Sequence, residues 1–222
     1  MGSYADKSVV LQVDEQEVVI DALLLGMSLS PHFQQLRQWA RRTPELHDFP
    51  IDYHRLQLEK WVWDHHPKGR VMDVGTLIPR RWIGPGYFSL GLGDCDCIGD
   101  SLQLPIADSS LDFALCTEVL EHVTSPKRAV AELRRALRPG GVLLASSPFA
   151  WPWHGCDDYA DYWRFTHQGW RLLLEQFSEV KLTACRWTEE GLSSIDIARR
   201  FEGWGFRNET AFTTGYLVEA TK

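Results

Sequence analysis

The sequence predicts an α/β fold in which a mostly parallel sheet carries helices on both faces. Short apolar runs, typical of buried strands, alternate with amphipathic segments of helical period through residues 70–221. Such alternation produces βαβ units, whose parallel strands are joined by right-handed crossovers. The length of 222 residues suits one large domain with a small extension. We therefore expect an N-terminal extension over residues 1–68 that caps an α/β domain over residues 69–222, both in one unit.

The N-terminal extension is expected to hold a strand and two helices. Residues 9–13 alternate between apolar and polar, which predicts a strand, and residues 18–25 either pair back with it or form a helix. The segment 28–42 predicts a helix, with Ser30 as N-cap. A second helix is expected over 53–66.

The α/β domain follows as alternating strands and helices. The strands are expected at 70–74, 87–92, 111–117, 141–149, 179–187 and 212–221, and the helices at 125–141, 166–177 and 193–204. In the helix 125–141, Ser125 is the expected N-cap, Pro126 occupies the first position and Gly140 ends the helix. Ligands of such sheets bind beyond the carboxyl ends of the strands, so the residues that follow each strand are the candidates for function.

One long segment carries a family resemblance. The run "GDSLQLPIADSSLDFALCTEVLEHVTSPKRAVAELRRALRPGGVLLASSPF" (99–149) resembles the class I S-adenosylmethionine-dependent methyltransferases, specifically the type 11 group. The likeness extends over about residues 70–187, and "DYWRFTHQGWRLLLEQF" (161–177) resembles a segment of compact members, some associated with sugar and cell-surface biosynthesis. The resemblance implies a Rossmann-like, seven-stranded class I methyltransferase fold, with S-adenosylmethionine as cofactor and S-adenosylhomocysteine as product.

The resemblance also implies where the cofactor lies. Asp100 stands where the family receives the adenine amino group, with Ser101 and Leu102 as its neighbours; the alternative is that Asp100 caps a turn. Thr117 and Glu118 end a strand near the expected sulfonium and amino-acid head. For Glu118 the alternative is a charge at the N-terminus of a helix, where the helix dipole stabilises it.

Two stretches depart from the family pattern. In "VMDVGTLIPRRW" (71–82), Asp73 and Gly75 remain, Thr76 follows, and the other glycines of the first turn are missing. Gly91 stands where the family commonly has an acid that binds the ribose hydroxyls, and Asp94 or Asp96 in the next turn could replace that acid. The expected cofactor-binding residues are Asp73, Gly75, Thr76, Gly91, Asp100, Ser101, Leu102, Thr117 and Glu118.

The polar loop "FAWPWHGCDDYADYWRF" (149–165) supplies the candidate catalytic residues. His154 is the best general base, because its reference pKa is near neutral, and Asp158 and Tyr162 could orient His154 or the substrate. The alternative is a polar loop built on a buried pair of Arg164 and Asp161. Glu121 and His122, which precede this loop in the sequence, are expected to stabilise a short helix.

Composition limits the partners. The net charge of −7 argues against nucleic acid, and no apolar run approaches the length of a membrane span. Five cysteines, an odd number, and a start without a secretory pattern predict a reduced, cytoplasmic protein. No metal site is expected, although His154, Cys156 and Asp158 form a conceivable ligand set. We expect a monomer or homodimer.

The sequence thus predicts a methyltransferase of biosynthesis that acts on a small molecule such as a sugar or a secondary metabolite. The alternative is a methyltransferase-like protein that does not methylate, either a repurposed cyclase or lyase or a non-catalytic partner. The shortened glycine turn and Gly91 favour this alternative.

Overall fold

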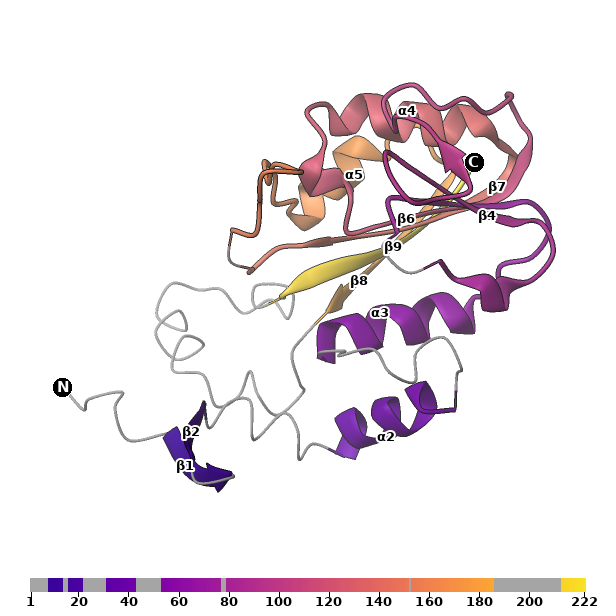
Figure 1. The fold of residues 1–222 in the computed structure, drawn as a ribbon. Coiled ribbons are helices and arrows are strands. Elements are labelled where there is room, and N and C mark those ends of the chain that lie inside the picture. Colours follow the sequence, from indigo (N-terminus) through magenta and orange to yellow (C-terminus); the bar gives the residue numbers. More distant parts are fainter. Residues whose placement is uncertain are drawn as a thin grey trace. The chain divides into compact units, whose positions relative to one another are not determined.

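The computed structural model describes residues 8–13, 16–21, 31–42, 53–76, 79–151, 153–185 and 213–222, and it divides the chain into two compact units (Figure 1). One unit comprises Met1–Gln57 and Arg186–Arg207, and the other comprises Leu58–Cys185 and Asn208–Lys222. The division of the chain at residues 68 and 69 stays a prediction.

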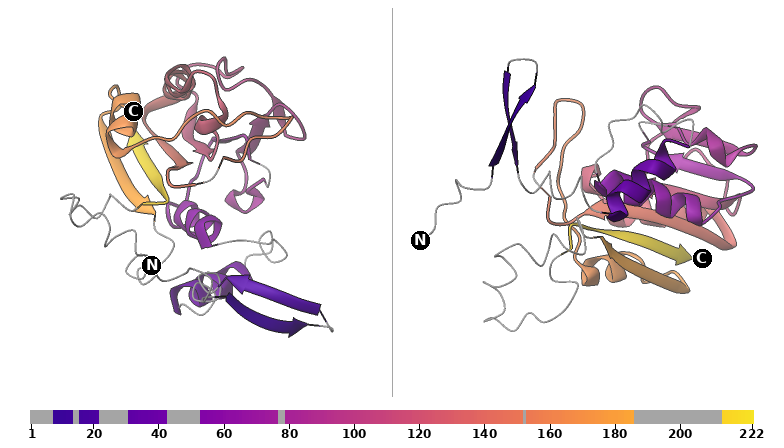
Figure 2. Two further views of the ribbon diagram at one scale, coloured as in Figure 1. Left: turned by 90° about the vertical axis from the view of Figure 1, so that its left-hand side faces the viewer. Right: turned by 90° about the horizontal axis from the view of Figure 1, so that it is seen from below.

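The smaller unit contains a β-hairpin and helical segments. Strands β1 (Ser8–Val13) and β2 (Gln16–Asp21) pair antiparallel (Figure 2), so the start of the apolar stretch 18–25 pairs back with the first strand. The expected helices are present as α2 (Pro31–Ala40), in this unit, and α3 (Tyr53–Asp64), which belongs to it up to Gln57 and to the larger unit from Leu58. The helix expected over 193–204 lies outside the described residues.

The larger unit is built on a seven-stranded sheet with the order β5-β4-β3-β6-β7-β9-β8. Its strands are β3 (Val71–Val74), β4 (Tyr87–Gly91), β5 (Cys97–Ile98), β6 (Leu111–Thr117), β7 (Leu137–Pro148), β8 (Glu179–Cys185) and β9 (Gly215–Thr221). The pairings from β5 to β7 are parallel, whereas β9 runs antiparallel to both β7 and β8. The expected mostly parallel sheet is confirmed.

Alternating strand residues supply two hydrophobic cores, one on each face of the sheet. On one face, Ala114 and Leu143 pack with residues of α4 (Pro126–Ala136) and α5 (His167–Leu173), including Leu133 and Trp170. On the other face, Leu115 and its strand neighbours pack with the second half of α3. Figure 1 shows α4 and α5 together on one side of the sheet and α3 on the other, so helices on both faces are confirmed.

Helix α4 ends earlier than the sequence suggested. It stops at Ala136, and Leu137 already begins β7. Leu137 is fully buried, and Pro139 disfavours helical backbone at Arg138, so the chain leaves the helix before Gly140, which lies within β7 and has φ 74°. Ser125 occupies the N-cap position, but its side chain makes no capping hydrogen bond.

The order of the strands defines the position of the site. From β3 the chain first adds β4 and β5 on one side, and then β6 and β7 on the other. The topological switch point therefore lies at the carboxyl ends of β3 and β6, which is where doubly wound sheets bind ligands. The residues following these strands, Gly75 and Glu118, lie at this edge.

Candidate functional site

The turn after β3 keeps one glycine for a steric reason. Gly75 has φ 67°, a left-handed conformation, and a Cβ at this position would lie 2.8 Å from Cγ2 of Val119. Its N–H donates to the carbonyl oxygen of Leu90 on the neighbouring strand, at 2.8 Å. Gly75 therefore joins β3 and β4 at a point where no side chain fits, and the half-buried Thr76 follows it.

Beyond Gly75, the arginine of the unusual turn points into the protein. Arg80 is 2% exposed and donates to Oδ2 of Asp73 at 2.8 Å, and to both carboxylate oxygens of Glu59 at 2.7 and 2.9 Å. It also donates to Oγ1 of the buried Thr117 at 3.1 Å, and the hydroxyl of Tyr87 donates to the same Asp73 oxygen at 2.9 Å. This arginine, which the sequence reasoning missed, connects β3, β6 and α3. An arginine close after an acid on a buried strand is the only signal for it in the sequence.

Two acidic side chains share the guanidinium of Arg80. Two carboxylates, from Asp73 and Glu59, face the single guanidinium of Arg80. Burial raises the pKa of Asp73, against the opposing effect of the Arg80 charge; burial disfavours charged Arg80, but the two carboxylates raise its pKa overall. Oδ1 of Asp73 is buried and accepts no hydrogen bond among the described residues. The site thus keeps one buried acceptor oxygen, on Asp73, that makes no hydrogen bond among the described residues.

At the end of β4 the two candidate acids differ. Asp96 accepts from the backbone N–H of Ser89 at 2.8 Å and from its hydroxyl at 2.9 Å, and it pairs with Arg81 at 2.6 Å. The hydrogen bonds from Arg81 and Ser89 hold the pKa of Asp96 well below its usual range. Asp96 therefore stabilises the β4 turn, which leaves the exposed Asp94 as the acid of this turn that could reach a ribose.

The backbone at Gly91 and Gly93 is open to a ligand. A Cβ on Gly93 would meet nothing within 4 Å, and one on Gly91 would meet only Sγ of Cys95 at 3.8 Å. Asp100 is exposed, and its Oδ1 accepts from the N–H of Leu102 at 2.8 Å, so it does cap a turn. Ser101 and Leu102 beside it are half-buried.

Glu118 follows β6 in a conformation that is uncommon for its residue type. Its φ is 56°, and its N–H lies 3.2 Å from both the carbonyl and the hydroxyl oxygen of Ser146 on β7. The Ser146 hydroxyl in turn donates to Oε1 of Glu118 at 2.5 Å. The neighbouring strand therefore holds Glu118 at the carboxyl edge of the sheet.

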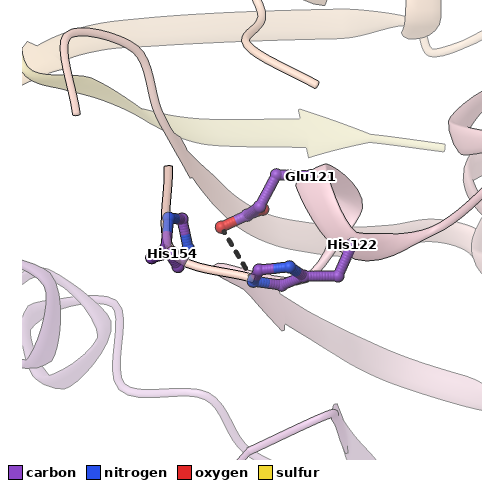
Figure 3. A group of neighbouring side chains, drawn as sticks. All are labelled: Glu121, His122 and His154. Carbon is purple, nitrogen blue, oxygen red and sulfur yellow. Dashed lines mark ion pairs between the residues drawn. The ribbon is translucent and has the colours of Figure 1, made fainter. Parts of the chain in front are cut away.

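A second polar cluster follows directly, formed by Glu121, His122 and His154 (Figure 3). Glu121 and His122 belong to a short 3-10 helix, η4 (Leu120–His122), and His154 comes from the loop after β7. Oε1 of Glu121 lies 3.8 Å from Nε2 of His122, and the two imidazole rings meet edge to face with centroids 4.9 Å apart. The expectation that Glu121 and His122 serve the short helix alone misses this grouping.

Backbone and carboxylate acceptors orient both histidines. Nδ1 of His122 lies 2.6 Å from the carbonyl oxygen of Ala160, and because a carbonyl only accepts, Nδ1 carries the proton and Nε2 keeps its lone pair. Nδ1 of His154 lies 3.2 Å from Oδ2 of Asp161, which also accepts the backbone N–H of His154 at 2.9 Å. Arg164 pairs with Asp161, as the alternative for this loop expected, and its hydrogen bonds lower the pKa of Asp161.

Burial determines the remaining pKa shifts of the cluster. Glu121 is fully buried, and burial, with the charge of Glu118, raises its pKa well above the usual range. Burial likewise lowers the pKa of His122. Neither carboxylate oxygen of Glu121 has a hydrogen-bond partner among the described residues.

Asp158 and Tyr162, the other catalytic candidates, differ from this cluster in their exposure to solvent. Both are exposed, Tyr162 by 53%, and the described contact of Tyr162 with the cluster is its backbone N–H, which donates to the Glu121 carbonyl at 2.7 Å. The structure thus brings His154 together with Glu121 and His122, and Asp161 supports it. The catalytic roles of His154, Asp158 and Tyr162 stay predictions.

Comparisons with known proteins identify the matching part of the chain. Residues 91–145 match a family model described as a methyltransferase domain. A thiol S-methyltransferase of Homo sapiens is 34% identical over 90 residues, which cover 35% of this chain and 37% of that protein. A demethylmenaquinone methyltransferase of Renibacterium salmoninarum is 39% identical over 77 residues, which cover 31% of this chain and 32% of that protein. The chain spans about a third of the length of these curated relatives.

Solved structures agree with the sheet order. A SAM-dependent methyltransferase from Archaeoglobus fulgidus superposes with a TM-score of 0.54 at 15% identity, covering 75% of this chain and 91% of that one. Phosphoethanolamine N-methyltransferase 2 of Haemonchus contortus, in complex with S-adenosyl-L-methionine, gives a TM-score of 0.53 at 11% identity, covering 93% of this chain and 62% of that one. At such identities the likeness shows the fold.

The sheet, in which β9 runs antiparallel between β7 and the edge strand β8, has the class I methyltransferase fold. Residues 91–145, which match the type 11 methyltransferase domain, are similar to the class I S-adenosylmethionine-dependent methyltransferases. The cofactor of this family is S-adenosylmethionine. Among the described residues, no helix is long and apolar enough to cross a membrane.

The residues at the switch point fit this cofactor. S-adenosylmethionine carries an ammonium and a sulfonium, and the buried Asp73 keeps one carboxylate oxygen that makes no hydrogen bond among the described residues. The open backbone at Gly91 and Gly93 admits a flat ligand, and Asp100 keeps an exposed carboxylate beyond it. The first turn has lost glycines, but the backbone at the end of β4 therefore remains accessible to a ligand.

Proposed function

We propose that the protein transfers a methyl group from S-adenosylmethionine to an oxygen, nitrogen or sulfur atom of a small molecule. The observation that carries the proposal is the placement of the Glu121, His122 and His154 cluster. It immediately follows β6, at the carboxyl edge where the family binds its cofactor, and two of its three residues lie inside the matched segment 91–145.

The chemistry asks for positioning and for removal of a proton. The sulfonium supplies the methyl group: the carbon–sulfur bond breaks, its electron pair stays on sulfur, and the acceptor atom forms the new bond to carbon. In-line geometry is the larger demand on the protein, and the acceptor must also lose its proton. The cluster of the buried Glu121 and the half-buried His122 and His154 offers lone pairs that could accept this proton, among them Nε2 of His122.

The other residues have separate roles in this proposal. Asp73 receives the cationic head of the cofactor, with Thr76, Thr117 and Glu118 around it, and Asp100 receives the adenine, with Ser101 and Leu102 beside it. Names of curated relatives state a thiol and demethylmenaquinone as acceptors, which supports a small-molecule acceptor. A sugar or a secondary metabolite is the narrower form of the proposal.

One observation favours the second candidate, a methyltransferase-like protein that does not methylate. Arg80 fills space next to Asp73, at the turn where the family keeps glycines for the approach of the ligand. A repurposed enzyme or a non-catalytic partner tolerates such filling.

Calorimetric titration with S-adenosylmethionine and with S-adenosylhomocysteine tests the proposal. We expect saturable binding of both, with adenosine alone as the control for recognition of the amino-acid head. Absence of binding at about 1 mM ligand, a free energy weaker than about 4 kcal/mol, would overturn it. Methyl transfer is then followed as production of S-adenosylhomocysteine with thiol, hydroxyl and amine acceptors.

A further inference from the structure

We propose that Glu121, His122 and His154 form a binding site for a divalent transition-metal cation of the zinc type. Two imidazoles and one carboxylate are a ligand set of catalytic zinc sites, which leave a further position for water or substrate. Imidazole ligands also favour zinc and its neighbours over Mg²⁺ and Ca²⁺, which prefer oxygen. Among the described residues, these three side chains bring potential ligand atoms within 4.8 Å of one another.

Both histidines of the cluster are oriented as metal ligands commonly are. A metal-bound histidine usually donates its other N–H to a carboxylate or a backbone carbonyl, which fixes the ring and its tautomer. Here Nδ1 of His122 faces the Ala160 carbonyl at 2.6 Å, and Nδ1 of His154 faces the Asp161 carboxylate at 3.2 Å. Both kinds of supporting partner are therefore present, and for His122 the nitrogen that keeps its lone pair is Nε2.

The buried carboxylate of Glu121 independently favours a bound cation. Its side chain is 0% exposed, and neither oxygen accepts a hydrogen bond among the described residues. A buried carboxylate without hydrogen bonds is costly unless a charge or a metal compensates it. Figure 3 shows its carboxylate directed toward the two imidazoles, so the unsatisfied oxygens point into the proposed site.

The surrounding charges also favour a cation. The charged groups that act on Glu121 are the carboxylates of Glu118 and Asp161 and the guanidinium of Arg164. With Glu121 itself, three carboxyl groups face one guanidinium, and Arg164 is engaged by Asp161. A cation bound in this cluster would therefore lie close to several carboxyl groups.

The distances require a small adjustment. Zinc bonds to nitrogen and oxygen are about 2.0–2.2 Å long, so two ligands of a tetrahedral ion lie roughly 3.4 Å apart. Glu121 and His122 are already 3.8 Å apart, while the widest separation in the cluster is within 4.8 Å. The group therefore has to close by about 1 Å or somewhat more, and His154, on a loop, is the ligand that moves most easily.

The role of the ion, but not its binding, rests on the proposed function. An open coordination position would take the thiol or hydroxyl of the acceptor, whose pKa a bound zinc ion lowers. The proton then leaves before the acceptor attacks, and histidine need not serve as the base. The site corrects the conceivable set of His154, Cys156 and Asp158, because Cys156 and Asp158 are exposed and do not join the cluster.

Metal binding is tested on the full chain without any cofactor. The protein is stripped with a chelator, freed of it, and titrated with Zn²⁺ by calorimetry and with Co²⁺ by visible absorption, whose intensity reports the coordination number. We expect one ion per chain, a dissociation constant of about 1 μM or below, and Co²⁺ bands of a low-coordinate nitrogen and oxygen site.

Variants separate this cluster from other ligands. Glu121→Gln keeps the size of the side chain, and His154→Ala changes a loop; each should weaken binding beyond the roughly tenfold loss that follows removal of a supporting partner. Cys156→Ala and Asp158→Ala are the matched controls and should bind as the parent does. Circular dichroism verifies that each variant is folded, and His122→Ala is added if it is.

Two results would overturn the site: no saturable Zn²⁺ binding, or unchanged affinity in both Glu121→Gln and His154→Ala. Loss of binding in the Cys156 or Asp158 variant would equally assign the metal elsewhere. The cofactor titration is run on metal-free protein, so failure to bind S-adenosylmethionine contradicts the proposed function and leaves the metal result standing, and the reverse also holds.

Discussion

Nη1 of Arg80 donates to Oδ2 of Asp73 across 2.8 Å, at the carboxyl end of the strand where the family places its cofactor. The segment "VMDVGTLIPRRW" lacks the further glycines of the family pattern, and it places the buried cation of Arg80 in this turn. Thr117 and Glu59 accept from the same guanidinium, so the turn is fixed to β6 and to α3. Where this turn departs from the family pattern, the side chain of Arg80 connects β3 with β6 and α3.

Replacement of Arg80 by methionine should strongly destabilise the fold. The change keeps much of the side-chain volume but leaves the buried carboxylates of Asp73 and Glu59 without their cation. Removing one partner of a buried ion pair costs about 3–5 kcal/mol. Urea denaturation followed by tryptophan fluorescence measures the loss in the free energy of unfolding.

The neighbouring Arg81 provides the matched control. Its side chain is 51% exposed and pairs with Asp96 at the surface. Arg81→Met should change the free energy of unfolding by about 1 kcal/mol or less, because exposed pairs contribute little. Equal losses in the two variants would contradict the assignment of Arg80 as the buried partner.

The sheet could be predicted from sequence because its signals are local. β6 occupies Leu111–Thr117 as expected, since its apolar run is bounded by polar turns on both sides. The predicted end of α4 was wrong for a reason that the local pattern does not contain. Leu137 fits the apolar periodicity of the helix, but it is buried in the core as the first residue of β7. Tertiary packing overrides helix propensity at such boundaries.

The site was less predictable because its contacts join distant residues. Arg80 meets Glu59 across 21 positions, and His122 meets Ala160 across 38. Neither pair has a spacing that a helix or strand would produce, and Arg80 follows a proline in what resembles an ordinary surface turn. The family resemblance located the cofactor edge, whereas the grouping of Glu121 with two histidines required the folded chain.

Gly75→Ala should destabilise the turn. An alanine would have to adopt φ 67° and place its Cβ 2.8 Å from Val119. The left-handed backbone alone costs roughly 1–2 kcal/mol for a residue with a side chain. Thermal unfolding measures the change, with Gly93→Ala as control, because a Cβ there meets nothing within 4 Å. An unchanged melting temperature for Gly75→Ala would show that the turn relaxes freely.

The two helix caps should respond differently to alanine. The Thr166 side chain accepts from the N–H of Gly169 at 3.0 Å at the start of α5, whereas Ser125 makes no side-chain cap hydrogen bond at the start of α4. Thr166→Ala should therefore cost about 1 kcal/mol, and Ser125→Ala clearly less. Denaturant titration of both variants is the measurement, and a larger loss for Ser125→Ala would reverse the assignment.

Asp100→Ala should weaken binding of S-adenosylmethionine by tenfold or more, or about 1.4 kcal/mol. The carboxylate is exposed beyond β5 and is the expected partner of the adenine amino group. Asp108→Ala, which removes an exposed acid paired with Arg135, is the control and should bind normally. Equal affinity of Asp100→Ala and the parent in calorimetry would place the adenine elsewhere.

Stability should fall in acid partly through Asp96. Hydrogen bonds from Arg81 and Ser89 lower its pKa in the folded protein, so the folded state holds the ionised form more strongly than the unfolded chain does. A group whose pKa is lowered in the folded state contributes stability at pH values above its unfolded pKa, about 3.9, and this contribution is lost as the pH falls further.

In Asp96→Asn this contribution is absent at every pH. Unfolding free energies measured between about pH 5 and pH 2.5 should therefore fall more steeply for the parent than for Asp96→Asn. Buried groups such as Asp73 titrate in both proteins and cancel in the difference. Parallel curves for the two proteins would mean that Asp96 keeps its ordinary pKa and that its bonds to Ser89 and Arg81 do not persist in solution.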